Sequence, residues 1–191
     1  MKGQKIIHIC SDEKFIQSAY LQFEEVCPKN NLFFLIVDDI SADLKYVETN
    51  ENFILVKKNI KKLKNLYKLY SNSRIICFHG LDYYRSIVLN NTPQNFVKIW
   101  FVWGFEFYNN TSFFNQNEII GHDTFKKFIK TNRFKNQVLK VKDVFRSSYY
   151  KIKKGTKSPD LEIKHAINKS DYCAILYKEE FDLIKSKVKS N

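Results

Sequence analysis

Strand-like and helix-like segments alternate along most of the chain, and this alternation constrains the fold more than any other feature. Short apolar runs predict six strands, and between them apolar residues recur at helical spacing. The strands are predicted at 5–10, 32–37, 52–57, 74–79, 97–103 and 172–176. Such alternation favours βαβ units and a mainly parallel sheet with helices on both faces. We therefore predict a single Rossmann-like α/β domain over residues 1–191, with a sheet of about six strands.

Local signals also predict the helices and part of the core. Ser11 or Asp12 would cap a helix that follows the first strand. Further helices are predicted over 60–70, 83–89, 123–130, 134–153, 161–169 and 178–188. Residues expected to be buried are Ile7, Ile9, Leu35, Ile76, Phe78 and Phe101. The first strand–helix turn lacks the glycine-rich dinucleotide fingerprint, and no P-loop occurs, so both usual nucleotide-binding modes are disfavoured.

Three predicted strand ends carry polar residues that would meet at one edge of a parallel sheet. Asp12 and Glu13 follow the first strand. His79 and Gly80 stand at the end of the fourth, and Glu106 lies just beyond the fifth. Because ligands of such sheets bind at the carboxyl ends of the strands, we expect these residues to line one cleft. A carboxylate or histidine there would deprotonate a sugar hydroxyl. The alternative roles are structural, with Asp12 as a helix cap and His79 as a hydrogen-bonded strand-end residue.

The segment 100–108 combines a strand end, a glycine and one carboxylate among aromatic rings. Gly104 would let the backbone turn or let a ligand approach closely. Trp103, Tyr108 and the two phenylalanines between them would form an apolar wall around Glu106. Such a wall suits a sugar, since ring faces cover its C–H surface while a carboxylate accepts hydrogen bonds from its hydroxyls. The alternative is a hydrophobic strand end with one solvated glutamate.

Nearly all of the net charge of +12 lies in one window of the chain. Between Lys126 and Lys157 there are twelve Lys and Arg residues and one acid, which leaves a net +11. Apolar residues from Phe134 to Ile152 recur at spacings of 4, 3, 4, 4 and 3, so the basic segment 122–157 is predicted to contain an amphipathic helix. Such a helix would lie on an anionic membrane surface.

Two other interpretations of the basic segment are weighed against membrane binding. One is a helix packed on the sheet with a solvated lysine face. The other is nucleic-acid binding, which we do not expect because no nucleic-acid motif accompanies the patch. On the membrane interpretation, the anion-binding residues are Lys126, Lys127, Lys130, Arg133, Lys135, Arg146, Lys151, Lys153 and Lys154.

Composition narrows the class of protein further. The four cysteines are widely spaced, each in an apolar context, and no CxxC motif occurs. This pattern is typical of reduced core cysteines in a cytosolic protein and disfavours a disulfide framework or a zinc site. The amino-terminal apolar run is too short for a signal peptide. No apolar run approaches the roughly 20 residues that a membrane span needs.

Three of these motifs together resemble a known family. They are the opening segment 6–16, the His79-Gly80 pair, and the run Trp103-Gly104-Phe105-Glu106-Phe107-Tyr108. The chain resembles the amino-terminal half of the bacterial 4-acetamido-4,6-dideoxygalactose (N-acetylfucosamine) transferases, which are glycosyltransferases of enterobacterial common antigen synthesis, and of their relatives. That family shows a Trp-Gly-x-acid-x-Tyr pattern in which the acid is usually Asp, whereas here it is Glu106.

The resemblance implies an acceptor-side domain of a two-Rossmann, type B glycosyltransferase. Such an enzyme moves a deoxyamino sugar from a nucleotide donor to a lipid-linked saccharide at the inner membrane face. Asp12 and Glu13 match the usual place of the catalytic base, and His79, Gly80 and the Trp103–Tyr108 run would bind substrate. No metal or cofactor is implied beyond the nucleotide-sugar co-substrate, which a second domain, expected to be absent from this chain, would bind.

Two alternatives stay open on the sequence. One is a non-catalytic Rossmann-like module that docks to a membrane or a partner through its basic face. The more remote one is a flavodoxin-like or receiver domain. Asp38 and Asp39 with the acids at 12–13 resemble the acidic pocket of a receiver, although the expected lysine and phosphorylated aspartate are not evident. The donor sugar, the acceptor and the stereochemical course remain open.

Overall fold

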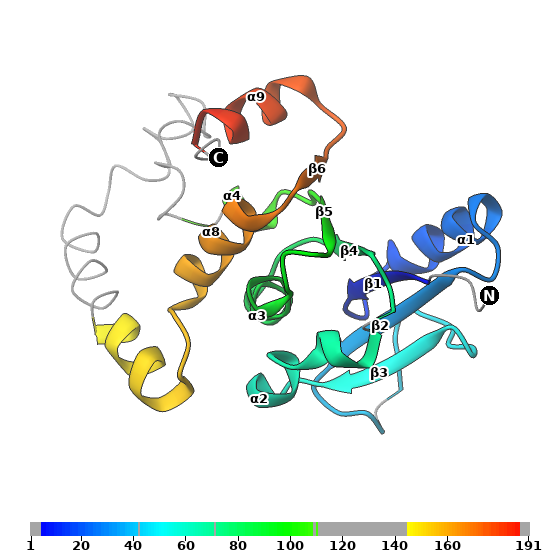
Figure 1. Ribbon diagram of the computed structural model, residues 1–191, viewed down its shortest axis with the longest axis horizontal. Coiled ribbons are helices and arrows are strands. Elements are labelled where there is room, and N and C mark those ends of the chain that lie inside the picture. Colours follow the sequence, from blue (N-terminus) through cyan, green and yellow to red (C-terminus); the bar gives the residue numbers. More distant parts are fainter. Residues whose placement is uncertain (1–4, 42, 71, 109, 111–144, 188–191) are drawn as a thin grey trace.

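The centre of the fold is one sheet of six parallel strands, ordered β3-β2-β1-β4-β5-β6 (Figure 1). The computed structural model describes residues 5–41, 43–70, 72–108, 110 and 145–187. The strands are β1 Ile6–Cys10, β2 Asn31–Val37, β3 Phe53–Lys57, β4 Ile75–His79, β5 Val97–Phe101 and β6 Tyr172–Ala174. The predicted single Rossmann-like α/β domain is therefore confirmed, with all six strands at their expected places.

Helices cover both faces of the sheet, as predicted, but they do so unequally. Figure 1 shows α1 (Ile16–Val26) on one face and α2 (Ile60–Leu63), α3 (Tyr83–Asn91) and α8 (Pro159–Lys169) on the other. The remaining elements are the 3₁₀ helix η1 (Leu66–Tyr70), the short helix α4 (Phe105–Tyr108), the π-helix η2 (Tyr150–Lys154) and α9 (Lys178–Lys187).

Strands β1, β2 and β3 contribute residues to two separate hydrophobic clusters, whereas β4, β5 and β6 contribute to the larger one. Ile7 and Ile9 of β1 belong to the larger cluster, on the side of α3 and α8, whereas Cys10 belongs to the smaller cluster under α1. The continuous apolar runs of these strands are explained by burial on both faces, which is typical of parallel sheets. Five of the six residues expected in the core are fully buried, and Phe101 is only half-buried.

Two helix boundaries differ from the predictions. Helix α1 has Phe15 at its N-cap without a side-chain cap, so the prediction that Ser11 or Asp12 caps it is wrong. The segment 60–70 forms two short helices instead of one, because the α-helical turns end at Leu63 and a 3₁₀ helix begins at Leu66. Short 3₁₀ stretches are common next to helix ends.

The basic segment is only partly described. The predicted helix 123–130 and most of the helix 134–153 lie outside the described residues. Residues 145–149 are α-helical and continue into η2, which ends at Gly155 with a left-handed backbone (φ +59°). Among the described residues, no helix is both long enough and apolar enough to cross a membrane.

Candidate functional site

The carboxyl ends of β1 and β4 lie side by side at the point where the strand order reverses. From β1 the sheet runs to β2 and β3 on one side and to β4, β5 and β6 on the other. In open α/β sheets a ligand binds in the crevice outside the carboxyl ends at such a switch point. The residues that follow β1 and β4 therefore form the candidate site.

A buried arginine connects the two strand ends across the switch point. Arg85 stands in the first turn of α3 and is only 2% exposed. Its guanidinium donates to the backbone carbonyl of His79, with Nη2 3.1 Å from Glu13 Oε1 and Nε 3.4 Å from Asp82 Oδ1. Burying a guanidinium is costly unless it is paired and hydrogen-bonded. Here the His79 carbonyl accepts a hydrogen bond and the two carboxylates supply the opposite charge, while Nε has no hydrogen-bond partner within the described part of the chain.

Glu13 is held at the site through one of its two carboxylate oxygens. Oε1 accepts from Ser11 Oγ and faces Arg85, while the side chain remains 32% exposed. The ion pair and the hydroxyl orient the carboxylate, because both act on the same oxygen. The other oxygen, Oε2, makes none of these contacts. Glu13 is therefore a positioned carboxylate at the surface of the switch point.

Asp12 has a structural role that differs from that of the adjacent Glu13. Its Oδ2 accepts from the backbone N–H of Lys45 at 2.6 Å, and its Oδ1 accepts from that of Tyr46 at 2.9 Å. Both oxygens thus fasten the loop between β2 and β3 to the end of β1. The structure separates the two carboxylates that the sequence presents as equivalent candidates.

The ring of His79 points into the α1 side of the sheet, where it lies among other rings. Its Nε2 is 3.0 Å from Nδ1 of His8, and its ring stacks on Phe101 at a centroid distance of 5.2 Å. Burial lowers the pKa of His79 well below its usual value, and a positive charge on the neighbouring His8 would act in the same direction. The backbone carbonyl of His79, rather than its ring, contacts the arginine of the switch point.

Gly80 allows the Phe101 carbonyl and the rings of Phe105 and Trp103 to lie close to the backbone next to this site. It has a φ of +70°, and its N–H donates to the carbonyl of Phe101 at 2.9 Å. A Cβ at this position would lie 2.9 Å from the Phe105 ring and 3.4 Å from Trp103. Both rings in turn lie against the Arg85 guanidinium, 5.4 and 5.7 Å from its centre. Contacts of this kind stabilise a buried cation.

Glu106 is 1% exposed and ties the β5–α4 turn to the strand before it. Its Oε1 accepts from Trp100 Nε1 at 2.8 Å and from the Trp103 N–H at 3.0 Å. Gly104, with a φ of +93°, makes the turn between Trp103 and Glu106. Within the described part of the chain, Oε2 has no hydrogen-bonding partner. Burial raises the pKa of Glu106, and these hydrogen bonds oppose the rise. The Tyr108 side chain lies outside the described residues.

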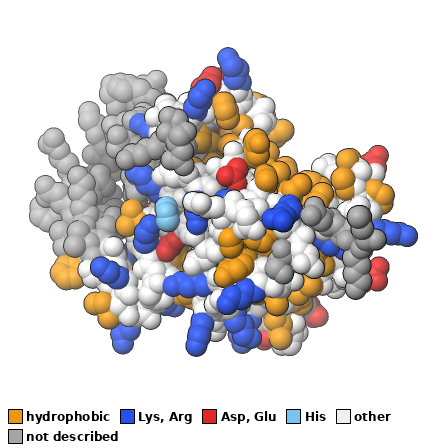
Figure 2. Space-filling model, in the orientation of Figure 1, with side chains coloured by type: hydrophobic (Ala, Val, Ile, Leu, Met, Phe, Trp, Pro, Cys, Tyr) orange, Lys and Arg blue, Asp and Glu red, His pale blue; other side chains and the backbone are white. Residues whose placement is uncertain are grey.

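The described part of the basic segment is exposed on both its charged and its apolar side. Arg146, Lys151, Lys153 and Lys154 are exposed. So are three residues of the apolar stripe, Phe145 (72%), Tyr149 (53%) and Ile152 (81%). Figure 2 shows hydrophobic side chains next to lysines at the corner that η2 occupies in Figure 1. Lys126, Lys127, Lys130, Arg133 and Lys135 lie outside the described residues.

Arg85 and His8 are the parts of the site that sequence reasoning missed. Arg85 lies within a helix whose apolar residues follow it, and no local pattern marks an arginine as buried. His8 lies in the middle of β1, and its contact with His79 joins residues 71 positions apart, which no local pattern reveals. Within the described part of the chain, no three His, Cys, Asp or Glu side chains come together as metal ligands would.

No protein-family model matches the chain, and neither a curated protein nor a solved structure shows significant similarity to it.

Proposed function

We propose that this chain is the acceptor-side domain of a glycosyltransferase that transfers a deoxyamino sugar from a nucleotide donor to a lipid-linked saccharide. The observation that carries the proposal is the position of Glu13. It stands at the switch point, partly exposed, and is oriented through a single oxygen by Ser11 and Arg85. A carboxylate in this arrangement is suited to take the proton of an acceptor hydroxyl as a general base.

Glu13, rather than Asp12, is assigned the role of base. Both oxygens of Asp12 accept backbone N–H groups of the β2–β3 loop, so that carboxylate has a structural partner on each side. In this proposal His79 and Glu106 shape the site from beneath, because both side chains are buried. Donor binding is assigned to a second domain of the type B arrangement.

The exposed stripe beside the lysines of the 145–154 segment supports a lipid-linked acceptor. Phe145 and Ile152 expose apolar side chains next to Arg146, Lys151 and Lys153. A helix with apolar and cationic residues on its surface lies in the headgroup region of an anionic bilayer. The proposal therefore places the domain at the inner membrane face as a peripheral protein.

The test is transfer by the full-length protein to lipid-linked saccharides from the membranes of the source cells. A panel of nucleotide sugars is supplied, and mass spectrometry detects products heavier by one sugar. Glu13→Gln is expected to lower kcat by about 100-fold or more while acceptor affinity stays within about twofold, since losing a general base affects turnover. Asp12→Asn is expected to lower thermal stability and raise KM, because it loosens the loop.

An unchanged kcat for Glu13→Gln would remove the base role. Failure of every donor in the panel to extend any acceptor would contradict the transferase itself. One observation favours the alternative of a non-catalytic module that docks to a membrane or partner: Asp12 and Glu106, two of the three carboxylates considered, hold backbone and indole groups in place. Vesicle binding without any transfer would support that module.

A further inference from the structure

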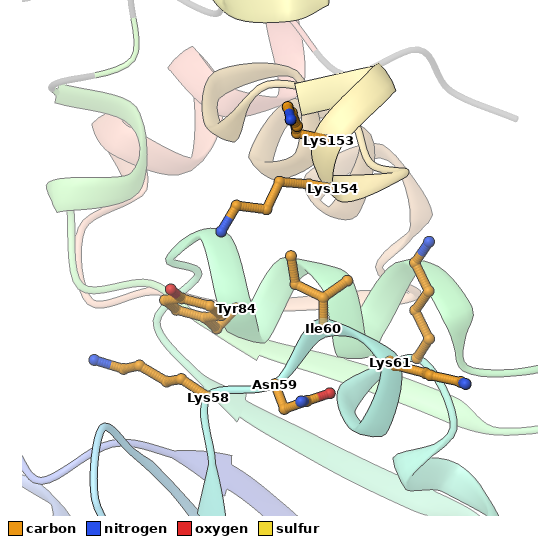
Figure 3. Close-up of a pocket in the computed structure, with 8 residues that line it drawn as sticks. Lys58, Asn59, Ile60, Lys61, Tyr84, Lys153 and Lys154 are labelled. Atoms are coloured by element: carbon orange, nitrogen blue, oxygen red, sulfur yellow. The ribbon is translucent and has the colours of Figure 1, made fainter. Parts of the chain in front are cut away.

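A pocket of about 520 Å³ opens beyond the carboxyl end of β3, between α2, the start of α3 and η2 (Figure 3). Its volume is within the range of small-molecule sites. No acidic side chain is among its lining residues, and five lysines are. The lining includes Lys58, Lys61, Lys64, Lys153, Lys154 and Tyr84.

The lysines come from three parts of the chain that are far apart in sequence. Lys58 follows β3, Lys61 and Lys64 lie on or just after α2, and Lys153 and Lys154 end η2. In Figure 3 the Lys154 side chain reaches from η2 toward Tyr84 on α3. The hydrogen bond from Lys64 Nζ to the Gly155 carbonyl, at 2.6 Å, holds η2 against α2 and keeps the two groups of lysines together.

Part of this charge is compensated within the protein, and the rest is not. Lys58 forms a 2.8 Å ion pair with Asp38. Lys61, Lys153 and Lys154 have no ion-pair partner among the described residues. Uncompensated ammonium groups that face one hollow repel one another, and a multivalent anion relieves that repulsion.

The neighbouring pocket provides a contrast. It has a volume of about 590 Å³ and also contains lysines, including Lys64, Lys151 and Lys157. However, Glu162 lies in its wall, where the carboxylate accepts from the Lys157 N–H at 2.8 Å and from Asn90 Nδ2 at 2.6 Å. An anion there would meet a buried carboxylate, so the pocket beside β3 is the one suited to a strongly negative ligand.

We propose that the lysine pocket beside β3 binds the diphosphate group of a diphosphate ester. Lysine ammonium groups make charge-assisted hydrogen bonds to phosphate oxygens, and a diphosphate has enough oxygens to engage several of them at once. The ester is either prenyl or nucleoside diphosphate, and the diphosphate chemistry is common to both. The prenyl form rests on the proposed function, and Ile152 supports it because this exposed residue precedes Lys153 and Lys154 directly.

The experiment measures equilibrium binding of inorganic pyrophosphate by calorimetry at constant ionic strength. Two matched pairs of variants distinguish binding in the pocket from a general effect of charge. They are Lys154→Glu against Lys151→Glu on η2, and Lys61→Glu against Lys62→Glu on α2. Within each pair the charge change and helix are the same, but only the first residue lines the pocket. The pocket variants are expected to weaken binding about tenfold or more, the matched variants about twofold or less.

Equal losses of pyrophosphate affinity within both pairs, or no pyrophosphate binding by the wild-type protein, would overturn the proposal that this pocket binds diphosphate. Circular dichroism checks that each variant is folded. A second arm compares a short, water-soluble prenyl diphosphate with a nucleoside diphosphate. Tighter binding of the prenyl ester is expected, and tighter binding of the nucleoside ester would overturn the lipid-linked assignment. Glu13→Gln should keep full pyrophosphate binding, so failure of the transferase proposal and failure of the pocket are distinguishable.

Discussion

At the scale of single residues, the buried pair of His8 and His79 is the most constrained feature of the domain. Asn31 Nδ2 donates to three acceptors, so its Oδ1 faces His8 Nε2 at 3.2 Å and that nitrogen carries a hydrogen. Nδ1 of a neutral His8 then accepts, and His79 Nε2 donates to it across 3.0 Å. A proton added to His8 would set two N–H groups against each other in the core.

The prediction at this scale concerns the pH dependence of stability. Burial lowers the pKa of His8 from 6.5 to about 4, and that of His79 also lies well below 6.5. The unfolded chain therefore takes up protons at a higher pH than the folded chain does, and stability is present above pH 6.5 and lost as the pH falls toward 4. We expect urea unfolding between pH 7 and 5 to show a falling free energy of unfolding, whose slope approaches about 1.4 kcal/mol per pH unit for each histidine once the pH is well below 6.5.

The control is the double variant His8→Phe, His79→Phe. It should be less stable at pH 7, because Asn31 Oδ1 loses its donor, but its stability should depend less on pH. A wild-type free energy of unfolding that stays constant from pH 7 to 5 would contradict the assignment of two neutral rings.

At the scale of elements, the two turns that follow β4 and β5 are built against each other. The N–H of Gly80 bonds to β5, and the aromatic residues after β5 close over Gly80 and Arg85. The segment after β5 therefore cannot move without disturbing the guanidinium that holds Glu13. The aromatic residues after β5 thus depend on Gly80 in the loop after β4, because a side chain at Gly80 would occupy the space of the Phe105 ring.

The prediction at the element scale is the effect of Gly80→Ala. A left-handed φ costs a residue with a Cβ about 1–2 kcal/mol, and crowding against the Phe105 ring adds about 1–3 kcal/mol. Gly155→Ala is the matched control, since Gly155 has a φ of +59° but nothing closer than 3.9 Å to a Cβ. Chemical denaturation should show a larger loss in the free energy of unfolding for Gly80→Ala than for Gly155→Ala. Equal losses would show that the Phe105 ring moves aside without destabilising the protein.

At the scale of the whole molecule, lysines of the described part of the basic segment lie close to those of α2. The window 126–157 carries a net +11 of the total +12, and its described part lies beside the lysine-rich α2. Figure 2 shows lysines across this part of the surface together with hydrophobic side chains. In the proposed function, a surface that is both cationic and apolar at one corner would orient the domain toward an anionic bilayer.

The whole-molecule prediction is selective binding to anionic vesicles. Each engaged lysine contributes on the order of 1 kcal/mol, so three or four give measurable recruitment that weakens with salt. Cosedimentation should show binding to phosphatidylglycerol vesicles and little to neutral ones. Changing Lys151, Lys153, Lys154 and Lys157 to glutamate should abolish it, whereas Phe145→Ser with Ile152→Ser should weaken it and keep the salt dependence. Equal binding to both vesicle types would contradict the electrostatic account.

The sequence by itself determined the elements and their order. Apolar runs such as 32–37 and 75–79 are typical of strands that are buried on both faces of a parallel sheet, and helical spacing between most of the strands indicates parallel crossovers. These signals are local. Only the tertiary structure decided that Asp12 fastens a loop, that Arg85 spans the switch point to Glu13, and that lysines from α2 and η2 share a pocket. Those contacts join residues from 33 to more than 70 positions apart, and no local pattern encodes which distant group a polar side chain meets.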